Sequence, residues 1–178
     1  MRIAFSGAHR TGKSTLLEQV ADSLSGYATV DEPYYLLEED GYETPEVPSL
    51  EDFQAQLERS LQVLEAGAPN VLFDRCPADI LAYLETHEDS SEFEPEDWID
   101  RVRDAMESLD LVLFVPVEAR DRIAVAEPEE RRLRRAVHDR LEELLIEDLV
   151  WDVDVLRVDG DEKSRLAQVL AHIGQRPT

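Results

Sequence analysis

Residues 7–15, Gly-Ala-His-Arg-Thr-Gly-Lys-Ser-Thr, follow the pattern G-x-x-x-x-G-K-[ST] of a phosphate-binding P-loop. A short apolar run, Ile3 to Phe5, precedes this stretch, and an amphipathic segment follows it. The glycines let the backbone turn tightly, so that successive N–H groups face phosphate oxygens at the positive end of a helix. The stretch therefore predicts a strand, a loop and a helix arranged around the phosphates of a nucleotide.

Two side chains of the loop carry its expected chemistry. Lys13 is predicted to reach the β- and γ-phosphates, and the Ser14 hydroxyl to take a ligand position on Mg²⁺. Lys13 is the only lysine in the first 160 residues of a chain with 16 arginines. We assign His9 no role, because we expect this variable position to point outward. The predicted ATP-binding residues are Gly7, Arg10, Thr11, Gly12, Lys13, Ser14 and Thr15.

Composition limits the class of protein. With 178 residues, the chain fits a single domain, 1–178, with a core of its own. The net charge of −23, from 41 acidic and 18 basic residues, argues against nucleic-acid and membrane partners. Cys76 is the single cysteine, and no apolar run approaches the ~20 residues of a membrane span. We expect a soluble, cytoplasmic protein without a signal peptide.

Apolar runs alternate with amphipathic segments along the whole chain. This alternation predicts an α/β fold with a five-stranded parallel sheet and helices on both faces, the three-layer sandwich of P-loop NTPases. Ser49 and Asp52 resemble a capping box at the start of one helix. The expected strands are 3–5, 27–31, 71–73, 109–115 and 152–158, and the expected helices are 13–25, 49–66, 77–86, 95–108 and 162–173, with an irregular or partly helical connection over 34–48.

Charged residues follow the second and third strands, where ligands bind in such sheets. Of Asp31 and Glu32, we expect one to face magnesium through water and the other to accept a proton from a substrate hydroxyl. Asp74 is a further metal candidate beside Ser14 and Asp31, and Arg75 would meet the transferred phosphate. The alternatives are a chance pair of acids in an acidic chain and a structural ion pair. Cys76 has no evident base nearby and is assigned to packing.

Seven of the 18 basic residues are arginines between positions 120 and 140. A cationic lid over 118–135 would stabilise charge on phosphoryl oxygens, with Arg131 and Arg135 as the catalytic candidates. The alternative is a solvated helix face whose arginines pair with neighbouring glutamates.

These motifs resemble the P-loop small-molecule kinases, in particular the deoxynucleoside kinase and thymidylate kinase group. Glu32-Pro33 is similar to a Glu-Pro motif whose glutamate is the base, and Phe53-Gln54 to a pair whose glutamine binds the nucleobase. Asp74-Arg75-Cys76 is similar to the Glu-Arg-Ser and Asp-Arg-Tyr triplets of these families. Phe73-Asp74 also resembles the nicotinamide riboside kinase-like small P-loop ATPases. The resemblance implies a nucleoside- or nucleotide-kinase-like fold.

The sequence thus predicts ATP- and Mg²⁺-dependent phosphoryl transfer to a small hydroxyl- or phosphate-bearing acceptor, most simply a nucleoside or nucleotide. The alternative is a nucleotide-dependent switch or regulatory ATPase whose arginine segment contacts a protein partner. A cavity between Glu32, Gln54 and Asp74 would favour the kinase. We leave open whether the protein is a homodimer. The predicted catalytic residues are Lys13, Glu32, Asp74, Arg75, Arg131 and Arg135, and the predicted acceptor-binding residues are Asp31, Glu32, Tyr35, Phe53, Gln54 and Arg75.

Overall fold

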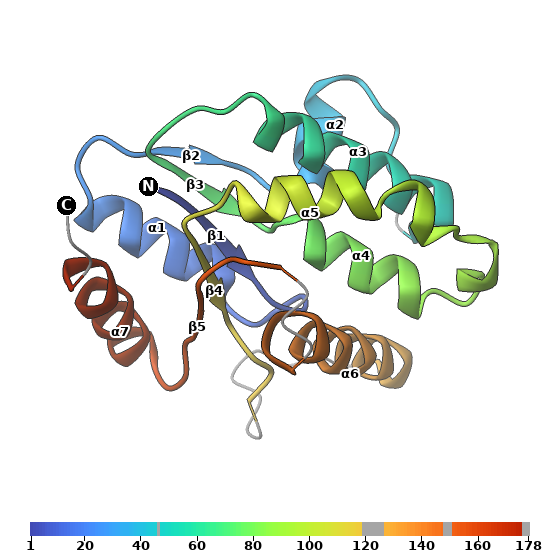
Figure 1. Ribbon diagram of the computed structural model, residues 1–178. Coiled ribbons are helices and arrows are strands. Elements are labelled where there is room, and N and C mark those ends of the chain that lie inside the picture. The colour runs from blue at the N-terminus through green and yellow to red at the C-terminus, as the bar shows by residue number, and fades with distance from the viewer. Residues whose placement is uncertain (46, 119–126, 148–150, 176–178) are drawn as a thin grey trace.

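A five-stranded parallel sheet forms the centre of the protein (Figure 1). The computed structural model describes residues 1–45, 47–118, 127–147 and 151–175. The strand order is β2-β3-β1-β4-β5, which confirms the predicted parallel α/β sheet. The strands are β1 (Arg2–Ser6), β2 (Ala28–Val30), β3 (Val71–Asp74), β4 (Leu111–Phe114) and β5 (Val155–Arg157).

The connections that leave β1 and β4, which are neighbours, lead to opposite sides of the sheet. After β1 the chain builds β2 and β3 on one side, and it then crosses to β4 and β5 on the other. Within the registered pairs, Ile3 lies opposite Leu72 of β3 and Leu111 of β4. The carboxyl end of β1 is therefore the switch point of the sheet, where parallel α/β folds bind ligands.

Helices cover both faces of the sheet, as the alternating pattern predicts. Helices α1 and α7 lie on one face, while α3, α4 and α5 lie on the other with α6 beside them (Figure 1). The helices are α1 (Lys13–Ser23), α2 (Pro33–Glu39), α3 (Leu50–Glu65), α4 (Pro77–Thr86), α5 (Ile99–Glu107), α6 (Pro128–Glu142) and α7 (Glu162–Gly174), with short helical turns at Ser90–Glu92, Pro95–Asp97 and Glu143–Glu147. No helix within the described ranges has the length and apolar composition to cross a bilayer.

Alternate residues of β1 supply two separate cores. Ile3 and Phe5 are fully buried against α1 and α7, whereas Ala4 joins the larger cluster under α3 and α4. A central parallel strand is buried on both faces, which explains why its sequence is a continuous apolar run. Both cores hold the strand rigidly up to Ser6, and the P-loop begins at the next residue.

Several element boundaries differ from the sequence prediction. Helix α2 begins at Pro33, because proline fits the first helical turn, and the connection expected over 34–48 as irregular or partly helical is partly helical, as expected. The turn at Pro95–Asp97 is a separate helical turn, and α5 starts only at Ile99. The predicted capping box is present: Asp52 accepts a hydrogen bond from the Ser49 backbone N–H at 2.7 Å, and the Ser49 hydroxyl accepts one from the Asp52 N–H.

Candidate active site

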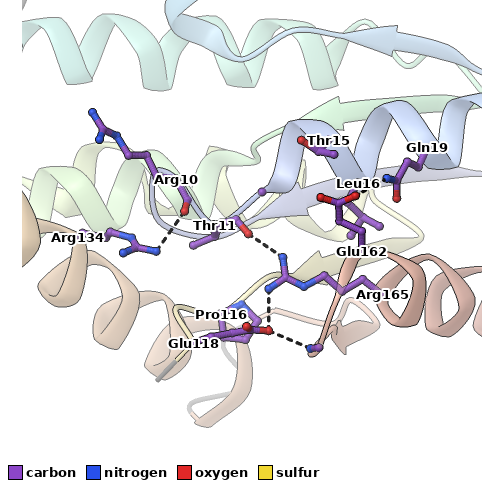
Figure 2. Close-up of a pocket in the computed structure, with 12 residues that line it drawn as sticks. Arg10, Thr11, Thr15, Leu16, Gln19, Pro116, Glu118, Arg134, Glu162 and Arg165 are labelled. Carbon is purple, nitrogen blue, oxygen red and sulfur yellow. Dashed lines mark hydrogen bonds and ion pairs between the residues drawn. The ribbon is translucent and has the colours of Figure 1, made fainter. Parts of the chain in front are cut away.

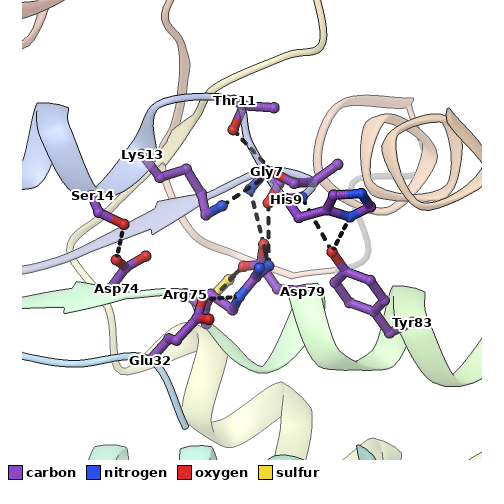
Figure 3. A network of polar contacts seen from close by, with 12 residues as sticks. Gly7, His9, Thr11, Lys13, Ser14, Glu32, Asp74, Arg75, Asp79 and Tyr83 are labelled. Carbon is purple, nitrogen blue, oxygen red and sulfur yellow. Dashed lines mark hydrogen bonds and ion pairs between the residues drawn. The ribbon is translucent and has the colours of Figure 1, made fainter. Parts of the chain in front are cut away.

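The P-loop turns at the carboxyl end of β1 and runs into α1 (Figure 3). Gly7 has a φ angle of 146°, and a Cβ atom there would lie 2.3 Å from the backbone oxygen of Val115. Gly12, with a φ angle of 86°, is the N-terminal cap of α1. Both positions demand glycine, one because the neighbouring strand end approaches it and the other because its backbone is left-handed. This is the local reason that the motif folds as a phosphate-binding turn.

Lys13 is held inside the loop. Its side chain is buried, and Nζ donates a hydrogen bond to the backbone oxygen of Ala8 at 3.1 Å. Burial and the nearby Arg75 lower the pKa of Lys13 to about 8. The ammonium group therefore lies within the loop and away from water, where its interaction with a phosphate oxygen is strong.

The lowered pKa of Lys13 predicts that ATP binding weakens above pH 8. Phosphates favour the ammonium form, so above this pKa the free protein must take up a proton as it binds. We expect the dissociation constant of ATP to rise by up to about tenfold per pH unit there, with proton uptake in calorimetric titrations. An affinity that stays constant to about pH 9.5, without proton uptake, would contradict the assignment.

Ser14 and Asp74, two of the three residues predicted as metal ligands, are in direct contact. The Ser14 hydroxyl donates to Asp74 Oδ2 at 2.6 Å, joining the start of α1 to the end of β3 (Figure 3). Among the described residues, Asp74 Oδ1 is buried without a hydrogen-bond partner. Burial raises the pKa of Asp74, although Lys13 and the Ser14 hydrogen bond oppose this change. A hydroxyl and a carboxylate with an unsatisfied oxygen fit Mg²⁺, which binds oxygen ligands.

Glu32 and Arg75 form a tight ion pair across the ends of β2 and β3. Arg75 Nε lies 2.5 Å from Glu32 Oε2, and Arg75 Nη1 also donates to the backbone oxygen of Gly7 at 3.3 Å. Burial disfavours the charged form of Glu32, but Arg75 and Lys13 outweigh burial and hold the pKa of Glu32 below its ordinary value. Glu32 is therefore an ionised acceptor near the P-loop, and Arg75 links it to that loop.

Asp79 is a site residue that the sequence prediction missed. Its side chain is fully buried in the first turn of α4; Oδ1 accepts from the Gly7 N–H at 2.9 Å and Oδ2 from the Cys76 N–H at 3.0 Å. Arg75 Nη1 lies 3.6 Å from the same carboxylate (Figure 3). Asp79 stands three residues after the helix cap Cys76, the spacing of a capping box, which is the local signal that points to it. Cys76 is buried, in agreement with its assignment to packing.

Replacing Asp79 with asparagine is expected to lower the free energy of unfolding by about 1–3 kcal/mol. The asparagine NH₂ group would face a backbone N–H, so one buried donor would lose its acceptor. Chemical denaturation measures the change. Asp104→Asn, which removes an exposed carboxylate on α5, is the matched control and should change stability by less than about 0.5 kcal/mol. Equal effects of the two substitutions would contradict the role of Asp79.

His9 does not point outward as expected. Its Nδ1 lies 3.0 Å from the Tyr83 hydroxyl oxygen, and its backbone N–H donates to the same oxygen at 3.2 Å. Burial and Arg75 lower the pKa of His9 to about 4, so the ring is neutral at pH 7. Tyr83 in turn stacks on Phe53 of α3, with ring centroids 5.3 Å apart. His9 thus links the P-loop to α4 and, through the Tyr83–Phe53 stack, to α3.

The arginine that contacts the P-loop from α6 is Arg134. Its guanidinium donates to the backbone oxygen of His9 and to that of Arg10, the second of which Figure 2 shows. The two arginines chosen from sequence lie elsewhere: Arg131 is exposed, and Arg135 is 63% exposed and pairs with Asp139 at 2.9 Å. Arg134 shares a buried helical stripe with Val137, His138 and Leu141, a spacing that would have identified it. Of the predicted lid, residues 119–126 lie outside the described residues.

A pocket lies beside the P-loop, on the side of α7 (Figure 2). Its empty volume, open to solvent, is about 630 Å³. Arg165 of α7, which the sequence prediction also missed, lines this pocket and donates to the Thr11 backbone oxygen. The other lining residues include the P-loop residues Arg10, Thr11, Gly12 and Thr15, together with Leu16, Gln19, Pro116, Glu118, Arg134, Gly160 and Glu162.

The acceptor-side candidates are only partly brought together. A second, smaller pocket is lined by Asp31, Asp74 and Arg75 at the ends of β2 and β3. Tyr35 is 53% exposed on α2, and Phe53 and Gln54 are half-buried on α3. Neither of these two pockets has Glu32 or Gln54 in its lining, so the expected cavity between Glu32, Gln54 and Asp74 is not one of them.

Solved structures share this arrangement of strands and helices. Deoxyadenosine kinase from M. mycoides with bound dATP is similar with a TM-score of 0.69 and 19% identity, covering 98% of this chain and 100% of that one. Thymidylate kinase from Candida albicans has a TM-score of 0.61 and 15% identity, over 97% of this chain and 90% of that one. Shikimate kinase from Aquifex aeolicus has a TM-score of 0.56 and 15% identity, over 98% and 96%.

Comparison with curated protein sequences gives no match. A family model described as AAA domain, in contrast, matches residues 2–165, which include the P-loop and all five strands. The structure agrees with that match, because it has the fold of P-loop kinases, a left-handed glycine turn and a buried lysine in the loop. The chain belongs to the AAA domain family.

Proposed function

We propose that the protein is an ATP- and Mg²⁺-dependent kinase that transfers a phosphoryl group to a small acceptor. The observation that carries the proposal is a group of three contacts at the ends of three neighbouring strands: the buried Lys13 in the P-loop, the Ser14–Asp74 hydrogen bond and the Arg75–Glu32 ion pair. Phosphoryl transfer requires a cation on the phosphates, a metal site and an acceptor-side carboxylate. These residues include a candidate for each.

The donor nucleotide is proposed to lie along the P-loop, with its base in the pocket beside α7. Pro116 and Leu16 give that pocket apolar surface, and Thr11 and Gly12 border it on the loop side. The phosphates would then lie over the loop amides and meet Lys13. Mg²⁺ would bind through Ser14 and Asp74 and neutralise charge on the phosphates, the chemistry it supplies in this class of reaction.

Glu32 is the proposed base on the acceptor. It follows the edge strand β2, whereas the pocket beside α7 is lined by residues that follow β4 and β5 at the other side of the sheet. Glu32 is ionised, as a proton acceptor must be. Arg75, held by both Glu32 and Asp79, would keep the carboxylate oriented while its positive charge faces the transferred group. That Arg131 and Arg135 stabilise the phosphoryl charge when a lid closes over the site stays a prediction.

We propose a nucleoside or a nucleotide as the acceptor. The aromatic rings of Phe53 and Tyr83 are stacked near Glu32, and the Arg75 guanidinium lies 5.3 Å from the centre of the Tyr83 ring. Stacked rings and a planar guanidinium suit a planar base better than a saturated ring. The solved deoxyadenosine and thymidylate kinase structures are consistent with this class.

One observation favours the alternative, a nucleotide-dependent switch. Glu32 forms an ion pair with Arg75, and neither of the two pockets is lined by both Glu32 and Gln54. Binding of an acceptor between these residues would therefore require side chains to move. Such a protein would bind and hydrolyse ATP without a small acceptor.

A thermal-shift screen separates the two functions. Nucleosides, nucleotides and related small hydroxyl-bearing metabolites are added, each with a non-hydrolysable ATP analogue and Mg²⁺. The kinase predicts that one class of acceptor raises the melting temperature beyond the analogue alone, because each ligand that binds only the folded state adds stability. Stabilisation by the analogue, with no further effect from any acceptor, would favour the switch.

A further inference from the structure

Three successive backbone oxygens of the P-loop, those of His9, Arg10 and Thr11, accept hydrogen bonds from two buried arginines. Figure 2 shows the contacts at Arg10 and Thr11. Arg134 of α6 donates Nε to His9 at 3.0 Å and Nη2 to Arg10 at 3.1 Å. Arg165 of α7 donates Nη1 to Thr11 at 2.7 Å. Two helices that are distant in sequence therefore hold the same short segment of the loop.

Arg165 is itself fixed on its other side. Nη2 donates to Glu118 Oε1 at 3.0 Å, and this oxygen also accepts from the Gly160 N–H at 3.0 Å. The Arg165 residue is only 7% exposed. Burying a guanidinium is costly unless its donors are paired. Arg165 pairs Nη1 with the loop and Nη2 with Glu118, whereas its buried Nε has no hydrogen-bond partner among the described residues. A bridge of this kind has one orientation, so the Thr11 carbonyl is held in one direction.

The direction of a carbonyl sets the direction of the next amide. In a planar trans peptide, C=O and N–H point in opposite directions. Holding the oxygens of His9, Arg10 and Thr11 toward the arginines therefore turns the N–H groups of Arg10, Thr11 and Gly12 to the opposite side of the loop. A guanidinium on the oxygen also polarises the peptide and strengthens its N–H as a donor.

We propose that Arg165, together with Arg134, is a positioning residue that fixes the P-loop amides toward the donor phosphates. The inference rests on the proposed function, because it assumes that phosphates bind to this loop. Donors that are already oriented need no reorganisation when the anion arrives, which is the source of the expected gain in affinity.

Arg165 also lines the pocket beside α7, so direct contact with the base is the competing role. The two roles predict different effects of an Arg165 substitution on the affinities for ATP and for tripolyphosphate. A positioning residue acts on the phosphates, so its loss weakens ATP and inorganic tripolyphosphate by the same factor. A residue that contacts the base affects ATP and leaves tripolyphosphate unchanged.

The test is calorimetric titration of ATP and of tripolyphosphate, with Mg²⁺, into wild-type protein, Arg165→Ala, Arg165→Lys and Arg103→Ala. Arg103 is an exposed arginine of α5 that pairs with Asp100, so it controls for loss of one positive charge. Loss of the charged hydrogen bond to Thr11 is expected to weaken both ligands about tenfold in Arg165→Ala, and Arg103→Ala should match wild type. Melting curves without ligand set a temperature at which every variant is folded.

Arg165→Lys distinguishes the bridge from charge alone. Lysine keeps the charge but lacks the planar fork that reaches Thr11 and Glu118 together. We therefore expect Arg165→Lys to show more than half of the affinity loss that Arg165→Ala shows. If Arg165→Ala does not fold, the lysine variant decides the question with the same two ligands. Full recovery with lysine, or an effect on ATP alone, would overturn the proposal. Failure of the wild-type protein to bind either ligand would instead reject the proposed function.

Discussion

Lys13→Ala is expected to lower kcat for phosphoryl transfer by about a thousandfold. Lys13 is buried within the P-loop, where solvent screens its ammonium charge little, and Nζ donates a hydrogen bond to the Ala8 backbone oxygen. A fixed charge in such a place stabilises developing phosphoryl charge far more than the same charge in water. The variant is assayed by ADP formation with the acceptor found in the screen.

The chain contains its own control for this substitution. Lys163 is the only other lysine, and it is exposed on α7. Lys163→Ala removes the same group from the surface and should keep wild-type kcat. A melting curve shows whether the alanine at position 13 leaves the fold intact. Substantial turnover by folded Lys13→Ala would mean that the P-loop lysine does not act on the transferred group.

Glu32→Gln is expected to reduce kcat by about a hundredfold or more while the dissociation constant of ATP stays nearly unchanged. Glutamine has nearly the same shape but cannot accept the proton of a substrate hydroxyl. The carboxylate belongs to the acceptor side of the site, so the P-loop and its contacts with the nucleotide remain. Calorimetric binding of ATP and steady-state turnover separate the two quantities.

The substitution also affects Arg75, whose guanidinium would keep Asp79 at 3.6 Å but lose the carboxylate at 2.5 Å. A melting curve therefore accompanies the assay, since a broken buried ion pair is destabilising. Asp31→Asn is the matched comparison, because Asp31 is the neighbouring acid and is exposed. Unchanged turnover in Glu32→Gln together with a large loss in Asp31→Asn would transfer the role of base to Asp31.

Local patterns in the sequence predict most of the fold. The P-loop motif places Gly7 and Gly12 where left-handed backbone is needed, and the apolar runs match all five strands. The Ser49–Asp52 capping box fixes the start of α3. These features depend on residues close together in the chain, so sequence spacing alone reveals them.

The supporting contacts of the site depend on residues distant in the chain. Arg165 meets Thr11 across 154 positions, and Asp79 meets Gly7 across 72. No local spacing predicts such pairs, because the order of strands in the sheet decides which loop ends meet. His9 differs from its prediction for the same reason: Tyr83 becomes its neighbour only when α4 packs beside the loop.

Helix register decides which arginine of α6 lies on the buried face of the helix. Arg131, Arg134 and Arg135 lie within one and a half turns, and composition alone does not distinguish them. The apolar residues Val137 and Leu141 mark the buried face, and Arg134 lies on it. The position of the hydrophobic stripe therefore identifies Arg134 as the buried arginine, which the density of charge does not.

A transfer assay analysed by mass spectrometry shows whether the P-loop transfers a phosphoryl group to a small acceptor. The protein is incubated with ATP, Mg²⁺ and pools of nucleosides, nucleotides and other small hydroxyl-bearing metabolites, with Lys13→Ala in parallel. We expect one acceptor to gain a phosphoryl group in step with ADP formation, and Lys13→Ala to form neither product. Release of inorganic phosphate from ATP by the wild-type protein, with no phosphorylated acceptor in any pool, would contradict this expectation.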